Sequence, residues 1–385
     1  MNLKIGQFSD SFLPINDGVG RVSYHYCDSL AKMGHQVYAI VPFADMGYRG
    51  DFPFEVIDYY AKPLLTMPQY DAGLPMFDIH YHHHLEQVKM DIVHAHTPFI
   101  AGVEAIIYAR KNNIPIVGTF HSKYYDDFYQ LTGSSLIAGF GRDRVVDFYN
   151  HCDEVWTVSE NAADTLRDYG YKGEIFVIEN GMDLKAVPEK DIIQARKSFS
   201  LSEDPVLLYV GQINEKKNLK KTIDACALLK KNGFSFQLVF AGKGPHEQKM
   251  KDLAKKNDVP LILTGHLQDE SLLNGLYALS DLFVFPSVYD TSSMVVREAA
   301  NAMTPSLVVK GSAPAEVIQD GFNGLLCDNN VESIYQNIAR ALSKREWLSQ
   351  IGINARNSIP VPWDTIAQRA TERYLYLINN IGGKL

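Results

Sequence analysis

The segment that decides the fold is Asp281-Leu-Phe-Val-Phe-Pro-Ser-Val-Tyr-Asp-Thr-Ser-Ser-Met-Val-Val-Arg-Glu298. It predicts a short apolar strand, a polar loop that begins at Pro286, and an apolar helix from about Met294. In an open α/β domain, such a junction places backbone N–H groups and a helix N-terminus at the carboxyl edge of the sheet, where phosphorylated ligands bind. Carboxylates placed there, here Asp290 and Glu298, can accept hydrogen bonds from sugar hydroxyls. The segment therefore suggests a nucleotide-sugar site.

The same alternation of strand and helix runs along most of the chain. It implies mostly parallel sheets with helices on both faces. The predicted strands form a first series at 3–8, 36–41, 91–94, 116–119, 155–158 and 174–178, and a second at 206–210, 237–240, 261–263, 282–285 and 307–309. The predicted helices include 20–33, 218–231, 245–256, 270–279, 294–303 and 363–378.

The length of 385 residues exceeds that of one ordinary core, so two domains are expected. The polar segment 183–204, which contains Pro188, separates the two series of strands and predicts a hinge. We expect an α/β protein with two Rossmann-like, doubly wound domains that face a cleft. They comprise residues 1–184 and 185–362, and a C-terminal helix within 363–385 crosses back to the N-terminal domain.

The composition excludes several classes of protein. The net charge of −8 argues against a nucleic-acid partner, which normally requires a basic face. The chain enters a strand at once and has no apolar run of the ~20 residues that span a bilayer, so we expect a cytoplasmic protein without a signal peptide. The cysteines form no CxxC motif and are expected to be reduced. They are Cys27, Cys152, Cys226 and Cys327.

Glycine-containing turns follow several predicted strands. The first, Asn16-Asp-Gly-Val-Gly20, opens a helix, and its glycines would let the backbone approach a phosphate, although a plain turn explains it equally well. The second, Gly211-Gln-Ile-Asn-Glu-Lys-Lys217, offers Lys216 or Lys217 to a diphosphate, but one lysine pair can also be a solvated basic turn. The third, Ala241-Gly-Lys-Gly-Pro245, suits a close turn before a helix.

Several histidines are candidates for function. His121 follows a predicted strand, where it could bond a substrate hydroxyl or transfer a proton, and a structural role is equally consistent. His80 and residues 82–84 lack companion ligands at metal-binding spacing, so a surface segment is favoured. His94 and His96 are expected to pack within the fold. The chain has no Asp-x-Asp, so we expect no metal site and no obligatory divalent ion.

Segments along nearly the whole chain, taken in order, resemble the retaining glycosyltransferases of family 4, which have the two-domain GT-B fold. The N-terminal half, with Phe8-Ser-Asp-Ser-Phe-Leu-Pro14 and His96-Thr-Pro-Phe99, is most similar to the bacterial diacylglycerol glucosyltransferases. The matching segments are Gly18-Val-Gly20, Lys32-Met-Gly-His-Gln-Val-Tyr38, Asp91-Ile-Val-His-Ala-His96, Thr119-Phe-His121, Val177-Ile-Glu-Asn-Gly-Met-Asp183, Val210-Gly-Gln-Ile-Asn-Glu-Lys-Lys-Asn218, Ala241-Gly-Lys-Gly-Pro245, Phe285-Pro-Ser-Val-Tyr-Asp290 to Glu298, and Glu316-Val-Ile-Gln-Asp-Gly-Phe-Asn-Gly324.

The resemblance implies roles for the matching residues. Lys217 would hold the donor diphosphate, Glu298 the ribose hydroxyls and Asp290 the donor hexose. His121 would contact the sugar across the cleft, and Gly18 to Gly20 would approach the phosphates. The implied catalytic residues are His121, Lys217 and Asp290. The implied donor-binding residues are Gly18, Val19, Gly20, Gln212, Lys216, Lys217, Gly242, Gly244, Asp290, Thr291, Ser292, Ser293, Met294 and Glu298.

The sequence departs from the family pattern at two site positions. Gln212 stands where the family usually has Arg, so Lys216 is the candidate to compensate for the lost charge. Asp290 stands where the family has Glu, which sets its carboxylate about 1–1.5 Å further back. Both changes bear on the choice of donor.

We therefore expect a retaining, metal-independent glycosyltransferase without a cofactor. It would move a hexose, most simply glucose, from a UDP-hexose to a lipid or cell-envelope glycoconjugate acceptor, with peripheral contact at the inner face of the cell membrane. The acceptor hydroxyl would attack from the same face as the leaving group. The alternative is a non-catalytic GT-B subunit that stabilises an active partner; a nucleotide-sugar epimerase would need an acid/base pair that the sequence does not show.

Overall fold

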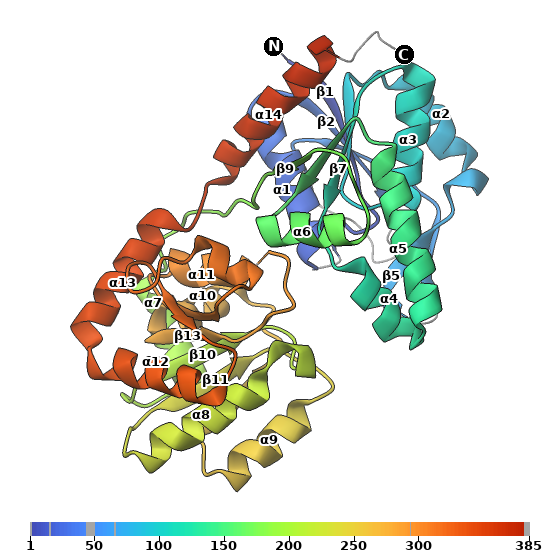
Figure 1. Cartoon of the computed structure of the whole chain (residues 1–385). Coiled ribbons are helices and arrows are strands. Elements are labelled where there is room, and N and C mark those ends of the chain that lie inside the picture. Colours follow the sequence, from blue (N-terminus) through green and yellow to red (C-terminus); the bar gives the residue numbers. More distant parts are fainter. Residues whose placement is uncertain (1, 15–16, 44–50, 65–66, 293, 381–385) are drawn as a thin grey trace. The chain divides into compact units, whose positions relative to one another are not determined.

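The computed structural model describes residues 2–14, 17–43, 51–64, 67–292 and 294–380 (Figure 1). The described residues fold as two compact units. The first comprises Met1–Gly181 with Val361–Leu385, and the second Met182–Pro360. The sequence predicts these boundaries after residues 184 and 362.

The first unit is built around a parallel sheet with the strand order β3-β2-β1-β6-β7-β8-β9. Chain order reverses between β1 and β6, so the loops that leave these two strands diverge, as at the ligand-binding switch point of other doubly wound sheets. The register pairs Gln7 of β1 with His94 of β6. The strands are β1 (Lys4–Phe8), β2 (Gln36–Pro42), β3 (Glu55–Tyr59), β6 (Ile92–Ala95), β7 (Ile116–Phe120), β8 (Glu154–Thr157) and β9 (Ile175–Val177).

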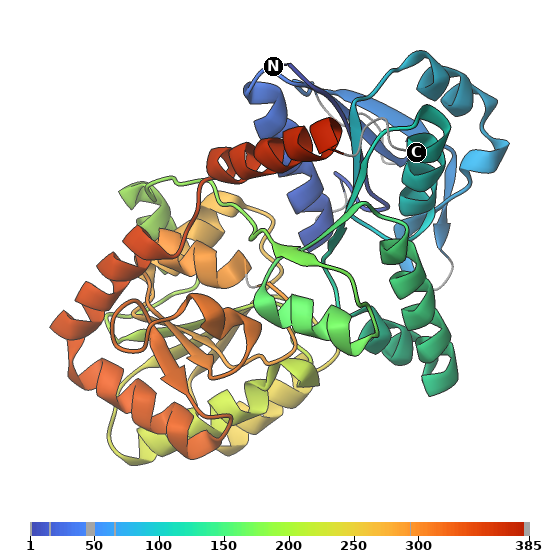
Figure 2. The ribbon, with the colours of Figure 1, turned by 45° about the horizontal axis from the view of Figure 1, so that its top comes forward.

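Alternate residues of these strands enter two apolar cores, one on each face of the sheet. In β2, Val37 and Val41 join the core that includes α1 and α14, whereas Tyr38 and Ile40 join the core that includes α3 and α5. The C-terminal helix α14 lies beside α1 in both views (Figures 1 and 2). The helices are α1 (Gly18–Lys32), α2 (Ile79–Gln87), α3 (Ile100–Asn112), α4 (Tyr124–Thr132), α5 (Ser135–Asn150), α6 (Glu160–Asp168) and α14 (Trp363–Asn380).

The segment 43–88, for which the sequence predicts irregular strands and a loop, contains further regular structure. A short antiparallel pair forms from β4 (Ala61–Leu64) and β5 (Met67–Gly73), and a turn over Pro75–Phe77 leads into α2. Among the described residues, no helix is both long enough and apolar enough to cross a membrane.

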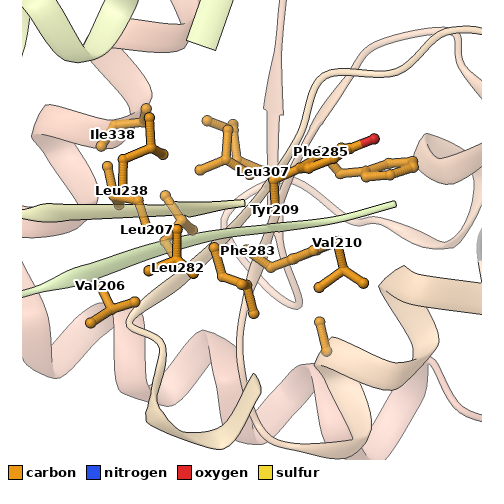
Figure 3. Packing of buried hydrophobic residues seen from close by; sticks show 14 of the residues in the cluster. Val206, Leu207, Tyr209, Val210, Leu238, Leu282, Phe283, Phe285, Leu307 and Ile338 are labelled. Carbon is orange, nitrogen blue, oxygen red and sulfur yellow. The ribbon is translucent and has the colours of Figure 1, made fainter. Parts of the chain in front are cut away.

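The second unit contains a parallel sheet with the strand order β12-β11-β10-β13-β14-β15, which reverses between β10 and β13. Its central apolar strands are buried on both faces, as expected for a parallel sheet covered by helices, whereas the edge strand β12 is half-buried (Figure 3). Tyr209 and Phe285 stack across the switch point with ring centroids 5.8 Å apart. The strands are β10 (Val206–Val210), β11 (Gln237–Ala241), β12 (Leu261–Gly265), β13 (Leu282–Phe285), β14 (Ser306–Val309) and β15 (Leu325–Cys327).

The helices of the second unit alternate with these strands. They are α7 (Glu189–Ser198), α8 (Leu219–Lys231), α9 (Glu247–Lys256), α10 (Glu270–Leu279), α11 (Met294–Asn301), α12 (Val331–Ser343) and α13 (Arg345–Ser358), with single 3₁₀ turns η2 (Glu215–Lys217) and η3 (Ala313–Val317).

Within 183–204, the segment predicted as a polar hinge, residues Glu189–Ser198 form the helix α7, which the sequence does not predict. Pro188 caps this helix, and acidic residues in its first turn and basic residues in its last turn complement the helix dipole. The helix packs closely on α10 because Gly275 has no side chain: a Cβ there would lie 2.2 Å from the Asp191 carbonyl oxygen. Because most residues of α7 are polar, the sequence gives no sign of this buried contact.

Candidate functional site

An ion pair crosses the switch point of the second sheet. Lys217 Nζ lies 2.6 Å from Asp290 Oδ1, and the two side chains are 12% and 22% exposed. Lys217 ends the turn that follows β10, and Asp290 lies in the loop that follows β13. Two of the predicted catalytic residues therefore meet at the carboxyl edge of the sheet, where open α/β sheets bind ligands.

Asn218 holds the two loops in this arrangement. Its backbone adopts the left-handed conformation, with φ of 56°, which Asn tolerates better than most residues. Its side-chain Nδ2 donates to the carbonyl oxygen of Pro286 at 3.0 Å, so the end of the first loop is bonded to the start of the second. The neighbouring lysines are thereby aimed at the β13 loop.

Lys216 occupies a second, apolar position at the same edge. Its Nζ lies 4.0 Å from the centroid of the Tyr289 ring, a cation–π distance. Within the part of the chain that the structure describes, this buried Nζ has no hydrogen-bond partner, and neither has Oδ2 of Asp290. Buried polar atoms normally have partners, so these two atoms mark a place where a polar ligand would complete the site.

The glycines of the two turns allow close backbone contact. A Cβ on Gly242 would lie 1.9 Å from the Gly211 carbonyl oxygen, and one on Gly244 would lie 2.3 Å from the Ile213 carbonyl oxygen. Gly242 also has φ of 151°, which side chains disfavour. Packing of the turns explains both glycines, and their contact with a donor stays a prediction. Gln212 is exposed beside them.

Glu298, the predicted ribose ligand, lies on α11 and accepts a hydrogen bond from Tyr277 Oη at 2.9 Å. Tyr277 is fully buried on α10, so it fixes one oxygen of the carboxylate. Thr291 and Ser292 are half-buried in the loop before α11, and Met294 begins that helix. The remaining predicted contact of this loop, Ser293, lies outside the described residues.

In the first unit, residues 18–20, for which a phosphate contact is predicted, form the first turn of α1. Asp17 caps this turn, and its Oδ1 accepts a hydrogen bond from the Gly20 N–H at 2.6 Å. A phosphate would have to compete with this carboxylate for the same N–H group. Gly18 is exposed and has open space where a Cβ would be, and Val19 is half-buried.

His121 lies just beyond β7 in a buried hydrogen-bonded network. Its Nε2 is 3.2 Å from His96 Nδ1, and His96 Nε2 is 2.7 Å from Gln7 Oε1 across the switch point. His94 Nδ1 is 2.6 Å from Tyr374 Oη on α14. Burial lowers the pKa of His121 to about 3, and burial, followed by the neighbouring histidines, lowers the pKa of His94 and His96. The three rings are therefore neutral at physiological pH.

Several side chains that contact the predicted residues are not recognisable from the sequence. The contacts of Asn218, Tyr277 and Tyr289 join different loops or helices and leave no local signal. Gln7 could have been found from the period of its strand, since it is a polar residue at a buried position. Among the described residues, no group of three or more His, Cys, Asp or Glu side chains is placed to hold a metal ion.

Comparison with protein families matches both units. A model of the glycosyl transferases group 1 matches residues 191–358, and a model of glycosyltransferase family 4 matches residues 16–186. The alpha-monoglucosyldiacylglycerol synthase of Acholeplasma laidlawii is 24% identical over 402 residues, which cover 100% of this chain and 99% of that protein. The GDP-mannose-dependent alpha-mannosyltransferase of Corynebacterium glutamicum is 27% identical over 336 residues, covering 85% and 77%.

Solved structures share the fold. Sucrose-phosphate synthase from Thermosynechococcus elongatus matches with a TM-score of 0.81 at 19% identity, over 98% of this chain and 100% of that one. The Anabaena protein HepE, in complex with UDP and glucose, matches with a TM-score of 0.77 at 18% identity, over 98% and 100%. The two Rossmann-like units with parallel sheets are those of the GT-B fold.

Proposed function

The chain belongs to the group 1 glycosyltransferases, in glycosyltransferase family 4, and is a hexosyltransferase; from this premise we propose that it transfers glucose from UDP-glucose to a diacylglycerol-type lipid, with retention of configuration and without a metal ion. The choice of sugar and acceptor follows the Acholeplasma relative, which aligns along the full length of both chains. The relatives named above are transferases and synthases, so a non-catalytic partner subunit is not proposed.

The ion pair of Lys217 and Asp290 is the observation on which the chemical proposal rests. As the bond between glucose and UDP breaks, negative charge grows on the diphosphate. Lys217, with Lys216 beside it, would stabilise this charge, as preorganised cations do in other transferases. The two ammonium groups would supply the positive charge that a divalent cation gives to metal-dependent enzymes.

The two oxygens of Asp290 would have different roles. Asp290 Oδ1 holds Lys217, and the buried Asp290 Oδ2 is an acceptor that a sugar hydroxyl would satisfy. Glu298, fixed by Tyr277, would accept hydrogen bonds from the ribose. In the first unit, neutral His121 would bind a hexose hydroxyl. A leaving phosphate oxygen would take the proton of the acceptor hydroxyl.

A lipid acceptor places the reaction at a membrane surface, and we propose peripheral contact with the inner face of the cell membrane. Large apolar side chains on α5 support such contact: Leu136 is 84% exposed and Phe140 is 63% exposed. Ile137 on the same helix is 53% exposed, and apolar side chains that gather into a contiguous exposed patch mark contacts with proteins or membranes.

The proposal is tested by incubating the protein with UDP-glucose or GDP-mannose and diacylglycerol in detergent micelles, with metal chelated by EDTA. Glucolipid with an α linkage, identified by NMR, is the expected product. Lys217→Ala should lower kcat at saturating donor by about 10²-fold or more, the range for loss of one transition-state charge contact. Lys220→Ala is the matched control, because Lys220 is an exposed lysine that pairs with Asp224 on α8.

Transfer from GDP-mannose alone would overturn the donor assignment, and a β-linked product would overturn retention. Unchanged turnover in Lys217→Ala would remove the ion pair from the mechanism. Activity that EDTA abolishes and magnesium restores would contradict metal independence.

A further inference from the structure

A continuous chain of hydrogen bonds leads from His121 to the C-terminal helix. It runs through His96 and Gln7 to Tyr374 Oη, which lies 3.3 Å from Gln7 Nε2 and 2.6 Å from His94 Nδ1. His94 Nε2 then contacts Thr119 Oγ1 at 2.6 Å. Gln7, His94 and His96 are at most 1% exposed, so water does not compete for these bonds.

The side-chain amide of Gln7 determines the direction of the chain. Its Oε1 only accepts, so the nitrogen that faces it, His96 Nε2, carries the hydrogen. Because His96 is neutral, its Nδ1 is then a lone pair. The nitrogen opposite that lone pair, His121 Nε2, must in turn donate.

The other half of the amide anchors this orientation. Gln7 Nε2 donates to Tyr374 Oη, which leaves the tyrosine proton for His94 Nδ1. The protonated His94 Nε2 then donates to Thr119 Oγ1. Every bond in the chain thus has a compatible donor and acceptor. Reversing the amide would reverse every link, so one side chain fixes the tautomers of several rings together.

We propose that Gln7 and His96 are positioning residues that hold His121 as the Nε2–H tautomer, with Nδ1 as its acceptor nitrogen. The inference rests on the proposed function in that His121 meets a sugar hydroxyl. In this tautomer, His121 can bind such a hydroxyl only as a hydrogen-bond acceptor. Neither Gln7 nor His96 has to touch the substrate, and both act through His121.

The tautomers are measured directly by NMR on protein labelled with ¹⁵N histidine, without substrate. The resonances of the 12 histidines are assigned by single substitutions. In the parent protein, Nε2 of both His96 and His121 should be protonated and Nδ1 of both should be unprotonated. Protonated Nδ1 in His121 would overturn the proposal without any variant.

Gln7→Met keeps a side chain of similar length but removes both hydrogen bonds of the side-chain amide. His121 should then be a mixture of tautomers. Gln7→Glu, which burial should keep as the neutral acid, supplies an oxygen acceptor for His96 Nε2–H and an O–H donor for Tyr374, so it should restore the Nε2–H form of His121. Thr119→Val is the matched control, since it removes only the far end of the chain and should leave His121 unchanged. If His121 were entirely in the Nε2–H form in Gln7→Met, Gln7 would not determine the tautomer of His121.

Measurements of kcat distinguish a failure of this proposal from a failure of the proposed function. Gln7→Met should lower kcat about 3- to 10-fold, the loss of one neutral hydrogen bond, without changing the affinity for UDP, and Gln7→Glu should recover most of it. If His121→Ala keeps full turnover while the parent shows the expected tautomers, the substrate role of His121 fails and its positioning stands. A mixed tautomer with unchanged kcat would refute the functional half of the proposal.

Discussion

Acidification should destabilise the first unit, because its buried histidines are held neutral. The pKa of His121 is lowered by burial to about 3, and those of His94 and His96 are also lowered well below the usual value. In an unfolded chain, histidine titrates near ~6.5. Below that pH the unfolded state binds protons that the folded state does not. The stabilisation is therefore complete above the unfolded pKa and is lost as the pH falls towards the folded pKa.

The size of the effect follows from the pKa difference. Each proton that only the unfolded state binds lowers the free energy of unfolding by about 1.4 kcal/mol per pH unit. Between pH 7 and pH 5, His121 alone should contribute a loss of about 2 kcal/mol. His94 and His96 contribute losses in the same direction.

The assay is urea unfolding at pH 7 and at pH 5, followed by tryptophan fluorescence. Trp156 reports on the first unit because it is buried and stacks on Tyr374 with ring centroids 5.5 Å apart. A Trp347→Phe background removes the tryptophan of the second unit. In this background, His121→Gln should lose about 2 kcal/mol less stability than the parent between the two pH values.

Exposed His80 on α2 provides the control, and His80→Gln should keep the pH dependence of the parent. The reasoning would be refuted if His121→Gln lost as much stability on acidification as the parent. Such a result would mean that His121 accepts a proton in the folded protein, as an exposed histidine does.

Three further substitutions test the second unit. Asp290→Asn should tighten UDP binding about five- to tenfold, equivalent to ~1 kcal/mol, because the diphosphate no longer competes with a carboxylate for the paired lysine. Calorimetry measures this, with Asp224→Asn as the control of equal charge, and weaker binding would contradict the assignment. Gly275→Ala should cost about 1–3 kcal/mol in urea unfolding, because its Cβ would overlap the backbone of α7. Gly139→Ala, which has open space on α5, should not destabilise the protein. Tyr277→Phe should weaken UDP binding about threefold or more, through the glutamate that it orients, with little effect on 2′-deoxy-UDP. Equal losses for both nucleotides would argue against a ribose contact.

Most strands of the second sheet were predictable because they are apolar runs, but β15 (Leu325–Cys327) is not among the predicted strands. The predicted bounds of β10 at 206–210 and β13 at 282–285 agree with the structure. Burial on both faces leaves no polar residue inside such a strand, so composition alone marks it. Helix α7 was missed because its one buried alanine and charged surface resemble a polar linker, and its contact depends on a glycine in a distant helix.

The candidate residues were predictable in kind but not in their contacts. Lys217 and Asp290 are 73 positions apart, and Gln7 and His96 are 89 apart. No local pattern records a contact over such a separation. The contacts follow from topology, because strands that are distant in the chain become neighbours where the strand order reverses.

The side chains that meet at the two switch points differ in charge. At each one, diverging loops leave space that long polar side chains bridge: a neutral pair in the first unit, Gln7 with His96, and an ionic pair in the second, Lys217 with Asp290. A buried neutral network favours hydroxyl groups, because a charge placed there would lose its hydration without a counter-charge. A half-buried lysine with an exchangeable carboxylate favours an anion that can replace that carboxylate. Under the proposed function, the uncharged sugar would therefore meet the histidines and the diphosphate would meet the lysines, and the tautomer and the ion pair can be perturbed separately.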